Sequence, residues 1–244
     1  MAEINSIFIT ATDTSVGKTF IAGLLLNFMR QQGLEAGYQK WVSTGDAGQA
    51  ADLKHCLDFA GLSLTADLSL LQVPYKFEFP ASPHLAAELE AKQVEPEFLV
   101  SCYKELLERY EFLIVEGVGG LLVPLRRDLL LADLLRRFKM PAILVARSGL
   151  GTLNHTLLIL EAMRHRELEL LGVILSDSGP AEDETLVRDN MRTIAEIGQV
   201  KVLGRMIWSQ SKEEAVNNFR PLGQEILNLI EESKSGNKGI DIPA

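Results

Sequence analysis

The sequence has few cysteines, no excess of positive charge and no long hydrophobic run. Its two cysteines, Cys56 and Cys102, are far apart and match no metal-binding or redox spacing, so we expect reduced thiols. The formal net charge of −9 argues against a basic face for nucleic acid or a membrane surface. No apolar run approaches the roughly 20 residues that span a membrane, and residues 1–6 carry no basic leader. We therefore expect a cytoplasmic protein without nucleic-acid or membrane partners.

What the sequence does have is an alternation of short β-rich runs and longer helical patterns over 244 residues, enough for one large α/β domain. That order is typical of parallel strands joined by helices, so we predict a mostly parallel, twisted sheet flanked by helices. The predicted strands are 7–10, 36–42, 112–116, 142–146, 171–176 and 200–204. The predicted helices are about 18–32, 48–60, 84–91, 96–109, 129–138, 152–166, 182–197 and 219–233.

Two segments depart from this alternation. Residues 62–83 contain Pro74, Pro80 and Pro83 and are interpreted as an irregular functional or interface loop. The polar stretch 234–244 is interpreted as a C-terminal tail. Since no internal repeat or low-complexity linker divides the rest, we predict a single domain over residues 1–233.

Residues 10–19, Thr-Ala-Thr-Asp-Thr-Ser-Val-Gly-Lys-Thr, join an apolar strand pattern to a helical one. A strand that turns into a helix at Gly-Lys-Thr is typical of a phosphate-binding loop. In such a loop, backbone N–H groups surround a polyphosphate, Lys18 neutralises it and the Thr19 hydroxyl holds Mg²⁺. The pattern G-x-x-x-x-G-K-[ST] would place its first glycine at Thr12, and an ordinary strand–helix turn is the alternative. The flanking elements favour a P-loop NTPase fold that binds a nucleoside triphosphate.

A second motif lies at residues 112–120, where an apolar strand ends in Glu116 and turns through Gly117-Val118-Gly119-Gly120. Ligands bind at the carboxyl edge of the strands in open α/β sheets. Glu116 is therefore predicted to bind Mg²⁺, directly or through water, beside the phosphate loop. The alternative is a strand-end glutamate that faces solvent. Three glycines in four positions let the backbone approach a ligand closely and favour the site.

Several further signals are weak on their own. Lys40, at the end of a predicted strand, is compatible with a solvated charge, and Asp52 with a surface acid. Residues 82–84, Ser-Pro-His, and 151–155, Gly-Thr-Leu-Asn-His, each resemble a turn that begins a helix. Thr or Asn at such a position can cap the helix, or the helix N-terminus can hold a carboxylate.

Together, these motifs resemble those of the dethiobiotin synthetase family over about residues 5–215. The family's loop Gly-Thr-Asp-Thr-x-Val-Gly-Lys-Thr is repeated at 11–19, with Ala11 in place of the leading glycine. Its Val-Glu-Gly-Ala-Gly-Gly is matched by 115–120 with Val118 as the one change, and its Leu-Gly-x-x-Asn-His is matched by 150–155. Its Thr-Ser-Pro-His is similar to residues 81–84, where Ala81 replaces the threonine. Its Gly-Tyr-Lys-Pro corresponds to Gly37, Tyr38, Lys40 and Trp41, with Gln39 as an apparent insertion, and its Ser-Gly to Thr44-Gly45.

The resemblance implies ATP as co-substrate and Mg²⁺ as cofactor. The implied metal ligands are Thr19, Asp52 and Glu116, and the implied catalytic residues are Lys40 and Lys18. The nucleotide would be bound by Thr14, Ser15, Val16, Gly17, Lys18, Thr19, Phe20, Asp52, Glu116, Gly117, Val118, Gly119, Ser176, Asp177, Trp208 and Glu214. The second substrate would be bound by Thr14, Lys40, Thr44 and, from the second subunit of a homodimer, Gly151, Thr152, Leu153 and Asn154. Ser176 replaces the family's base-contacting Asn, and Ile207-Trp208 replaces its Pro-Trp.

The implied activity is that of a ligase of biotin biosynthesis, which converts 7,8-diaminononanoate, CO₂ or bicarbonate and ATP into dethiobiotin, ADP and phosphate. One amine captures CO₂ as a carbamate, whose oxygen attacks the γ-phosphate to give a carbamic–phosphoric anhydride. The second amine then closes the ring and expels phosphate.

Two alternatives share the fold. The first is a ParA/MinD-like partitioning ATPase, whose loop carries an extra lysine where this chain has Asp13. The second is a non-catalytic regulatory relative, against which the intact Lys18, Thr19, Asp52 and Glu116 argue.

Overall fold

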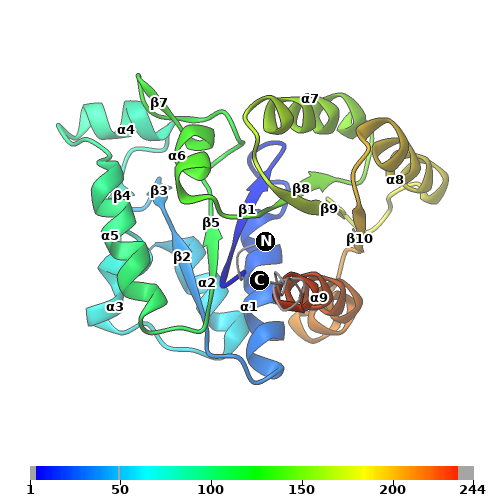
Figure 1. Cartoon of the computed structure of the whole chain (residues 1–244), viewed down its shortest axis with the longest axis horizontal. Helices are drawn as coiled ribbons and strands as arrows, with labels where there is room; N and C mark the ends of the chain where they lie inside the picture. The colour runs from blue at the N-terminus through cyan, green and yellow to red at the C-terminus, as the bar shows by residue number, and fades with distance from the viewer. Residues whose placement is uncertain (1–3, 49, 236–244) are drawn as a thin grey trace, which may run out of the picture.

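A sheet of six parallel strands runs through the middle of the molecule (Figure 1). The computed structural model describes residues 4–48 and 50–235. The strand order is β10-β9-β8-β1-β5-β2. The bounds are β1 (Ser6–Ala11), β2 (Ala36–Lys40), β5 (Phe112–Glu116), β8 (Ala142–Arg147), β9 (Leu170–Ser176) and β10 (Val202–Met206). Every residue of β1, β2 and β5 is buried, because helices cover both faces of the sheet.

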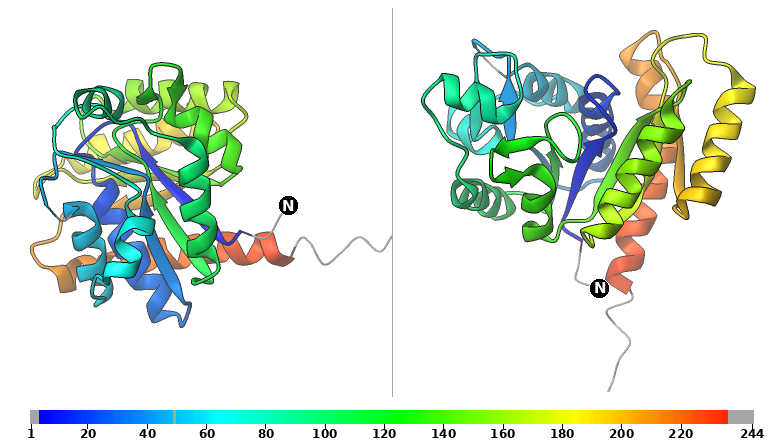
Figure 2. Two further views of the ribbon diagram at one scale, coloured as in Figure 1. Left: turned by 90° about the vertical axis from the view of Figure 1, so that its left-hand side faces the viewer. Right: turned by 90° about the horizontal axis from the view of Figure 1, so that it is seen from above.

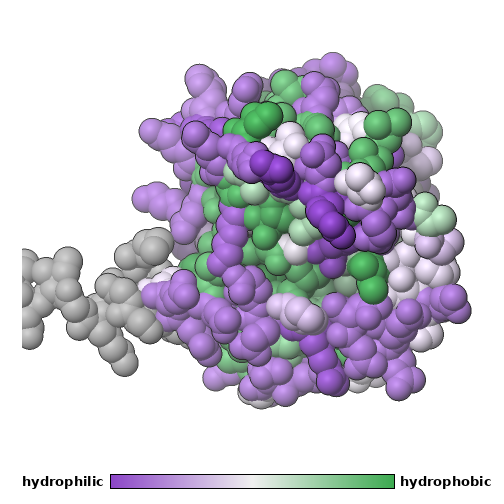
Figure 3. Space-filling model, turned by 90° about the vertical axis from the view of Figure 1, so that its right-hand side faces the viewer, coloured by the Kyte–Doolittle hydropathy of each residue, from purple (hydrophilic) through white to green (hydrophobic). Residues whose placement is uncertain are grey.

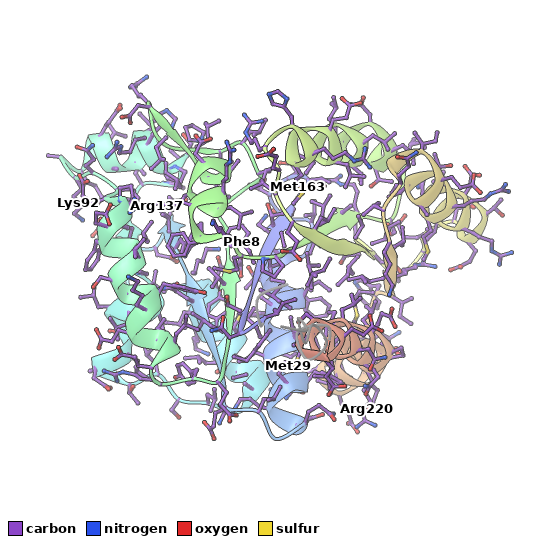
Figure 4. The ribbon with its side chains drawn as sticks, in the orientation of Figure 1. Phe8, Met29, Lys92, Arg137, Met163 and Arg220 are labelled. Atoms are coloured by element: carbon purple, nitrogen blue, oxygen red, sulfur yellow. The ribbon has the colours of Figure 1, made fainter. Side chains whose placement is uncertain are left out.

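The helices form one layer on each face of the sheet (Figure 2). One layer contains α1 (Lys18–Gln31), α2 (Ala51–Ala60) and α9 (Lys212–Ser235), and the other contains α5 (Pro96–Leu107), α6 (Leu131–Phe138), α7 (Thr152–His165) and α8 (Glu184–Gly198), with α4 (Pro83–Leu89) beside them. Alternation along β1 separates the two cores, since Ile7 and Ile9 pack with the first layer and Phe8 with the second. Figure 4 labels Met29 of α1 in the first core and Phe8 and Met163 in the second.

The predicted α/β architecture is confirmed, with each predicted strand present within two residues of its expected start. The prediction of a continuous strand over 36–42 was wrong at its end. β2 stops at Lys40, and β3 (Val42–Thr44) leaves the sheet to pair in parallel with β4 (Tyr75–Phe77). β2 has no bulge at Gln39, because it pairs with β5 residue by residue from Ala36↔Phe112 to Lys40↔Glu116.

Residues 62–83 are more ordered than the predicted loop. They contain α3 (Ala66–Gln72) and β4, whose formation depends on contacts with distant elements, among them β3. A short hairpin of β6 (Pro124–Arg126) and β7 (Leu129–Leu130) also escaped prediction. Elements of two to seven residues carry too few turns or alternations to stand out in a sequence pattern.

The last helix was predicted too short. α9 begins at Lys212 rather than at 219. At this start, the Ser211 hydroxyl accepts a hydrogen bond of 3.1 Å from the Glu214 N–H. Its first turns are polar, so the apolar periodicity starts late. The helix includes Lys234 and Ser235 of the predicted tail, and residues 236–244 lie outside the described residues.

The side of the molecule that carries β10, α8 and α9 shows apolar atoms between polar ones (Figure 3). β10 is the edge strand there, and its first four residues are only partly buried. Among the described residues, no helix is both long and apolar enough to cross a membrane.

Candidate functional site

Residues 12–17 form a loop from the carboxyl end of β1 to the first turn of α1. The Thr12 N–H donates to the Val145 carbonyl at 3.0 Å, which ties the loop to β8. Gly17 has a φ of +99°, in the left-handed region, and a Cβ there would lie 2.8 Å from the Ser176 hydroxyl. Only glycine fits that conformation and that close approach. The loop therefore presents backbone N–H groups and the N-terminus of α1 to one site, an arrangement suited to an anion.

A cavity of about 390 Å³ opens at this loop, at the carboxyl ends of β1, β2 and β5. Its lining brings together most of the predicted phosphate and metal residues with Thr44: Thr14, Ser15, Gly17, Lys18, Thr19, Lys40, Ser43, Thr44, Asp52, Glu116, Val118 and Gly119. Ser43 is an addition that sequence reasoning missed, although it directly precedes the predicted Thr44. Its hydroxyl is hydrogen-bonded to Asp46, which follows β3.

Glu116 is fully buried at the end of β5, where its register partner on β2 is Lys40. The Lys40 ammonium donates to Glu116 Oε1 at 2.9 Å, and the Thr19 hydroxyl donates to the same oxygen at 2.8 Å. Lys40 also donates to Asp52 Oδ2 from α2. The second oxygen, Oε2, accepts a hydrogen bond of 2.7 Å from the Tyr38 hydroxyl. β2 and the phosphate-loop helix α1 thus meet at the carboxylate of β5, and α2 is joined to them through Lys40.

The two buried lysines differ in charge environment. Burial by itself lowers the pKa of Lys40, but attraction to Glu116 and Asp52 outweighs burial and raises that pKa above its ordinary value. Burial lowers the pKa of Lys18 from 10.5 to about 8, because attraction to Glu116 offsets it only in part and Lys40 adds repulsion. The Lys18 ammonium donates to the Asp13 carbonyl at 2.8 Å. Lys40 is therefore a fixed positive charge. Lys18 lacks a full counter-charge, which a negatively charged ligand would supply.

The oxygen atoms around Lys40 fit a magnesium ion. In the described part of the chain, no group of three or more His, Cys, Asp or Glu side chains could hold a metal. Asp52, Glu116 and the Thr19 hydroxyl nevertheless converge beside the phosphate loop, and both carboxylates already share one cation. Mg²⁺ is bound by one or two carboxylates together with phosphate and water oxygens. These residues match that donor set.

Seven of the predicted nucleotide residues lie outside the cavity lining, and three of these belong to the phosphate loop, the start of α1 and the turn after β5. The Val16 side chain is buried in the first core, and the Phe20 ring packs edge-on against Phe59. The Gly117 N–H donates to the Ile9 carbonyl at 3.1 Å, which holds the turn after β5. Their contribution to ligand binding is thus limited to the backbone and the shape of the loop.

Of the residues predicted at the nucleotide base, Ser176, Asp177 and Trp208 lie at or just after the ends of β9 and β10, and Glu214 lies in the first turn of α9. Ser176 contacts the Gly17 region, and the Asp177 carboxylate accepts hydrogen bonds from Ser148, from the Arg205 guanidinium and from the Trp208 N–H. Glu214 accepts a hydrogen bond of 2.8 Å from the Gln210 N–H. Since Asp177 has an exposed side-chain fraction of 4% and this many partners, its role here is to hold the turn before Trp208. A base contact by these side chains stays a prediction.

Residues 151–154 begin α7 and are not part of the cavity lining in the described chain. Thr152 is buried, with its hydroxyl 3.2 Å from that of Thr156, so its side chain is engaged within α7. Asn154 is exposed, and Leu150, just before the helix, is 85% exposed. A substrate contact by Thr152 stays a prediction, for which its N–H group is better placed than its side chain.

The fold and the site together define a P-loop nucleotide-binding protein: a parallel sheet, a glycine–lysine–threonine turn after β1 and a buried acid at the end of the adjacent β5. A family profile described as "AAA domain" matches residues 5–215. The "ATP-dependent dethiobiotin synthetase BioD" of Methanococcus vannielii is 33% identical over 198 residues, covering 81% of this chain and 91% of that protein. The protein of the same name from Rhodopseudomonas palustris is 40% identical over 200 residues, covering 82% and 84%. The chain belongs to the dethiobiotin synthetase family.

Solved structures of other P-loop ATPases share the fold. The cell division ATPase MinD of Pyrococcus furiosus has a TM-score of 0.57 and 17% identity, covering 93% of this chain and all of that one. The ParA family ATPase of Chlorobium tepidum has a TM-score of 0.53 and 14% identity, covering 94% and 99%. At such identities the likeness extends to the fold alone. Family membership therefore rests on the synthetases.

Proposed function

We propose that the protein converts 7,8-diaminononanoate, CO₂ and ATP into dethiobiotin, ADP and phosphate. The observation that carries the proposal is the cluster of Lys40, Asp52, Glu116 and Thr19 beside the phosphate loop, in a chain that belongs to the synthetase family. Phosphoryl transfer needs alignment and charge neutralisation more than covalent help. This cluster provides both at the place where the γ-phosphate would lie.

The phosphoryl-transfer step uses groups that the chain supplies. Lys18 and the loop N–H groups bind the phosphates, and the Lys40 ammonium faces the same cavity. Mg²⁺, held by Thr19, Asp52 and Glu116, would neutralise charge on the phosphates. A carbamate formed from one amine and CO₂ attacks the γ-phosphorus and ADP leaves with the bond electrons. The second amine then attacks the carbamoyl carbon, a ring closes, and phosphate and a proton are released. Because both amines belong to one substrate, closure is intramolecular.

The raised pKa of Lys40 defines its part in this sequence. An ammonium held by two carboxylates keeps its proton, so Lys40 acts by charge and hydrogen bonding rather than as a general base. The departing amine protons therefore go to the substrate's own oxygens or to water.

We further propose a homodimer in which residues 151–154 of one subunit hold the substrate carboxylate of the other. These residues lie outside the cavity of their own chain, and the N-terminus of α7 suits an anion. Leu150, just before α7, and Leu158, within it, are 85% and 55% exposed, and such apolar side chains support a surface that is covered in a dimer. The predicted cytoplasmic location, without nucleic-acid or membrane partners, belongs to the same proposal.

The proposed reaction has a direct test. The protein is incubated with the diamine, isotopically labelled bicarbonate and MgATP, and the cyclic urea is sought by mass spectrometry. We expect one labelled carbon per product and one ADP per ring. ATP hydrolysis with no cyclic urea would instead support a partitioning or regulatory ATPase.

A further inference from the structure

The Tyr38 hydroxyl is a buried contact of Glu116 to which no role is yet assigned. Tyr38 and Lys40 are two residues apart on β2, so their side chains leave the same face of the sheet. Both reach Glu116, but they take different oxygens: Lys40 bonds Oε1 at 2.9 Å and Tyr38 bonds Oε2 at 2.7 Å. Tyr38 packs in the first core with an exposed fraction of 0%. Water therefore does not replace its hydroxyl readily.

The two oxygens of Glu116 are unequal because of this contact. Oε1 accepts from Lys40 and Thr19, which both line the cavity, whereas Oε2 accepts only from Tyr38 among the described residues. A carboxylate can rotate about its last bond, and a fully buried oxygen without a donor is costly. The phenol donor removes that cost when one oxygen points at Tyr38, and the other oxygen, here Oε1, then faces the cavity. A half-turn exchanges two equivalent oxygens, so the contact fixes the plane of the carboxylate.

We infer that Tyr38 is a positioning residue that presents Glu116 Oε1 to the metal and the phosphates. The inference rests on the proposed metal site and concerns its geometry, independently of the second substrate. A phenylalanine fills the same space in the core, so the hydroxyl is not needed for packing. Groups that orient metal-binding carboxylates typically change metal affinity or activity by about 10- to 100-fold when removed.

The test uses Tyr38→Phe in the full-length protein, with ATP present and no diamine. Mn²⁺ serves as the probe, and its binding is followed by electron paramagnetic resonance. We expect Mn²⁺ affinity to fall about tenfold, while ATP binding in the presence of a chelator stays within twofold. In turnover assays the half-saturating Mg²⁺ concentration should rise, with the KM for the diamine unchanged.

Tyr103→Phe is the matched control, because it also deletes a phenol hydroxyl with a 2.7 Å hydrogen bond, here to Ser6. It should leave Mn²⁺ affinity unchanged even where thermal stability falls. Unchanged Mn²⁺ affinity in folded Tyr38→Phe, or an equal loss in Tyr103→Phe, would overturn the inference.

If Tyr38→Phe does not fold, 3-fluorotyrosine at position 38 keeps the shape and makes the hydroxyl a stronger donor. A shift in Mn²⁺ affinity of twofold or more is then expected, and no shift would overturn the inference. Since no diamine is present, these results are separate from the test of dethiobiotin formation. A protein that makes no cyclic urea but shows the expected Mn²⁺ pattern would refute only the proposed reaction.

Discussion

Lys18 and Lys40 are two cations buried in one site, and their different partners give them different chemistry. Lys40 has two carboxylates within hydrogen-bonding reach, whereas Lys18 donates to a neutral carbonyl, that of Asp13. Burial without a full counter-charge costs free energy, which a bound polyphosphate would recover. The surroundings of Lys18 therefore favour a negatively charged ligand.

Protons should accompany nucleotide binding. Burial lowers the pKa of Lys18 to about 8, so without nucleotide only about a quarter of the molecules carry the Lys18 proton at pH 8.5. Bound phosphates raise that pKa again, and ATP is already deprotonated at this pH. We expect MgATP binding to take up about 0.7 proton, and affinity to fall as pH rises through about 8. Calorimetry in two buffers with different ionisation enthalpies measures the uptake.

Lys18→Arg is the control for this measurement, since arginine keeps the charge and does not titrate. It should bind MgATP without proton uptake. Equal uptake by the arginine variant would assign the proton to another group. Lys18→Ala should lose both ATP affinity and, by about 100-fold or more, turnover.

Removal of the Lys40 ammonium should separate binding from chemistry. In Lys40→Ala and Lys40→Gln we expect MgATP affinity within a few-fold of the parent protein and turnover at saturation reduced about 100-fold or more. The metal-free variants should also lose about 3 kcal/mol of unfolding free energy, because Glu116 is left buried without its cation. Mg²⁺ should restore part of this stability in urea titrations. Lost ATP affinity with normal turnover would reverse the role proposed for Lys40.

At the scale of elements, the first core depends on how closely α9 approaches α1. Gly223 of α9 lies against the Phe28 ring of α1, and a Cβ at that position would be 2.5 Å from its Cγ. Since Cγ is close to the backbone of α1, the ring cannot move away without displacing the helix. Glycine is therefore required at this crossing, despite its poor helix propensity.

Gly223→Ala should destabilise the protein by about 1–3 kcal/mol, the range for overpacked cores. Helix propensity alone predicts the opposite, a gain of about 1 kcal/mol. Gln224→Ala, at the exposed neighbouring position, is the control and should change stability by less than about 0.5 kcal/mol. Urea unfolding of the parent protein, Gly223→Ala and Gln224→Ala shows whether overpacking or helix propensity dominates the change in stability. A more stable Gly223→Ala would show that α9 can move away from α1.

For the whole molecule, the proposed homodimer predicts complementation between inactive chains. Lys18→Ala damages the phosphate loop, and Asn154→Ala damages the exposed start of α7 that would serve the neighbouring subunit. In a mixed dimer, one of the two sites receives both intact halves. Co-expression of the two variants should therefore restore part of the activity. Thr152 is left unchanged, because its buried side chain bonds Thr156 and its removal would test packing.

The control pairs Lys18→Ala with Lys40→Ala, which lie in the same half of the site. No site in that mixed dimer is intact, so no activity should return. No activity from isolated heterodimers of the first pair would show that the site is built within one chain. Activity from the control pair would show that recovery does not depend on sharing between subunits.

The sequence by itself determined the α/β class, the six strands of the sheet, the phosphate loop and the position of Glu116 at a strand end. These features are local: apolar runs of strand length, helical periodicity and a Gly-Lys-Thr turn are specified by neighbours in the chain. Family motifs then added Lys40 and Asp52, which no local pattern separates from surface charges. The same local reasoning found α1 within one residue of its end and misjudged α9, whose first turns are polar.

The tertiary structure alone decided which of these groups meet and through which atoms. Tyr38 and Glu116 are 78 residues apart in sequence, and their hydrogen bond exists because β2 and β5 are neighbours in the sheet. The pairing of β3 with β4, and the buried position of Thr152, likewise follow from packing between distant segments. Local patterns specify helices and strands. Contacts between these elements require residues far apart in the chain to come together, and a local sequence pattern does not encode which residues meet. The sequence therefore located the site, and the fold determined the hydrogen-bonding partners of its charges.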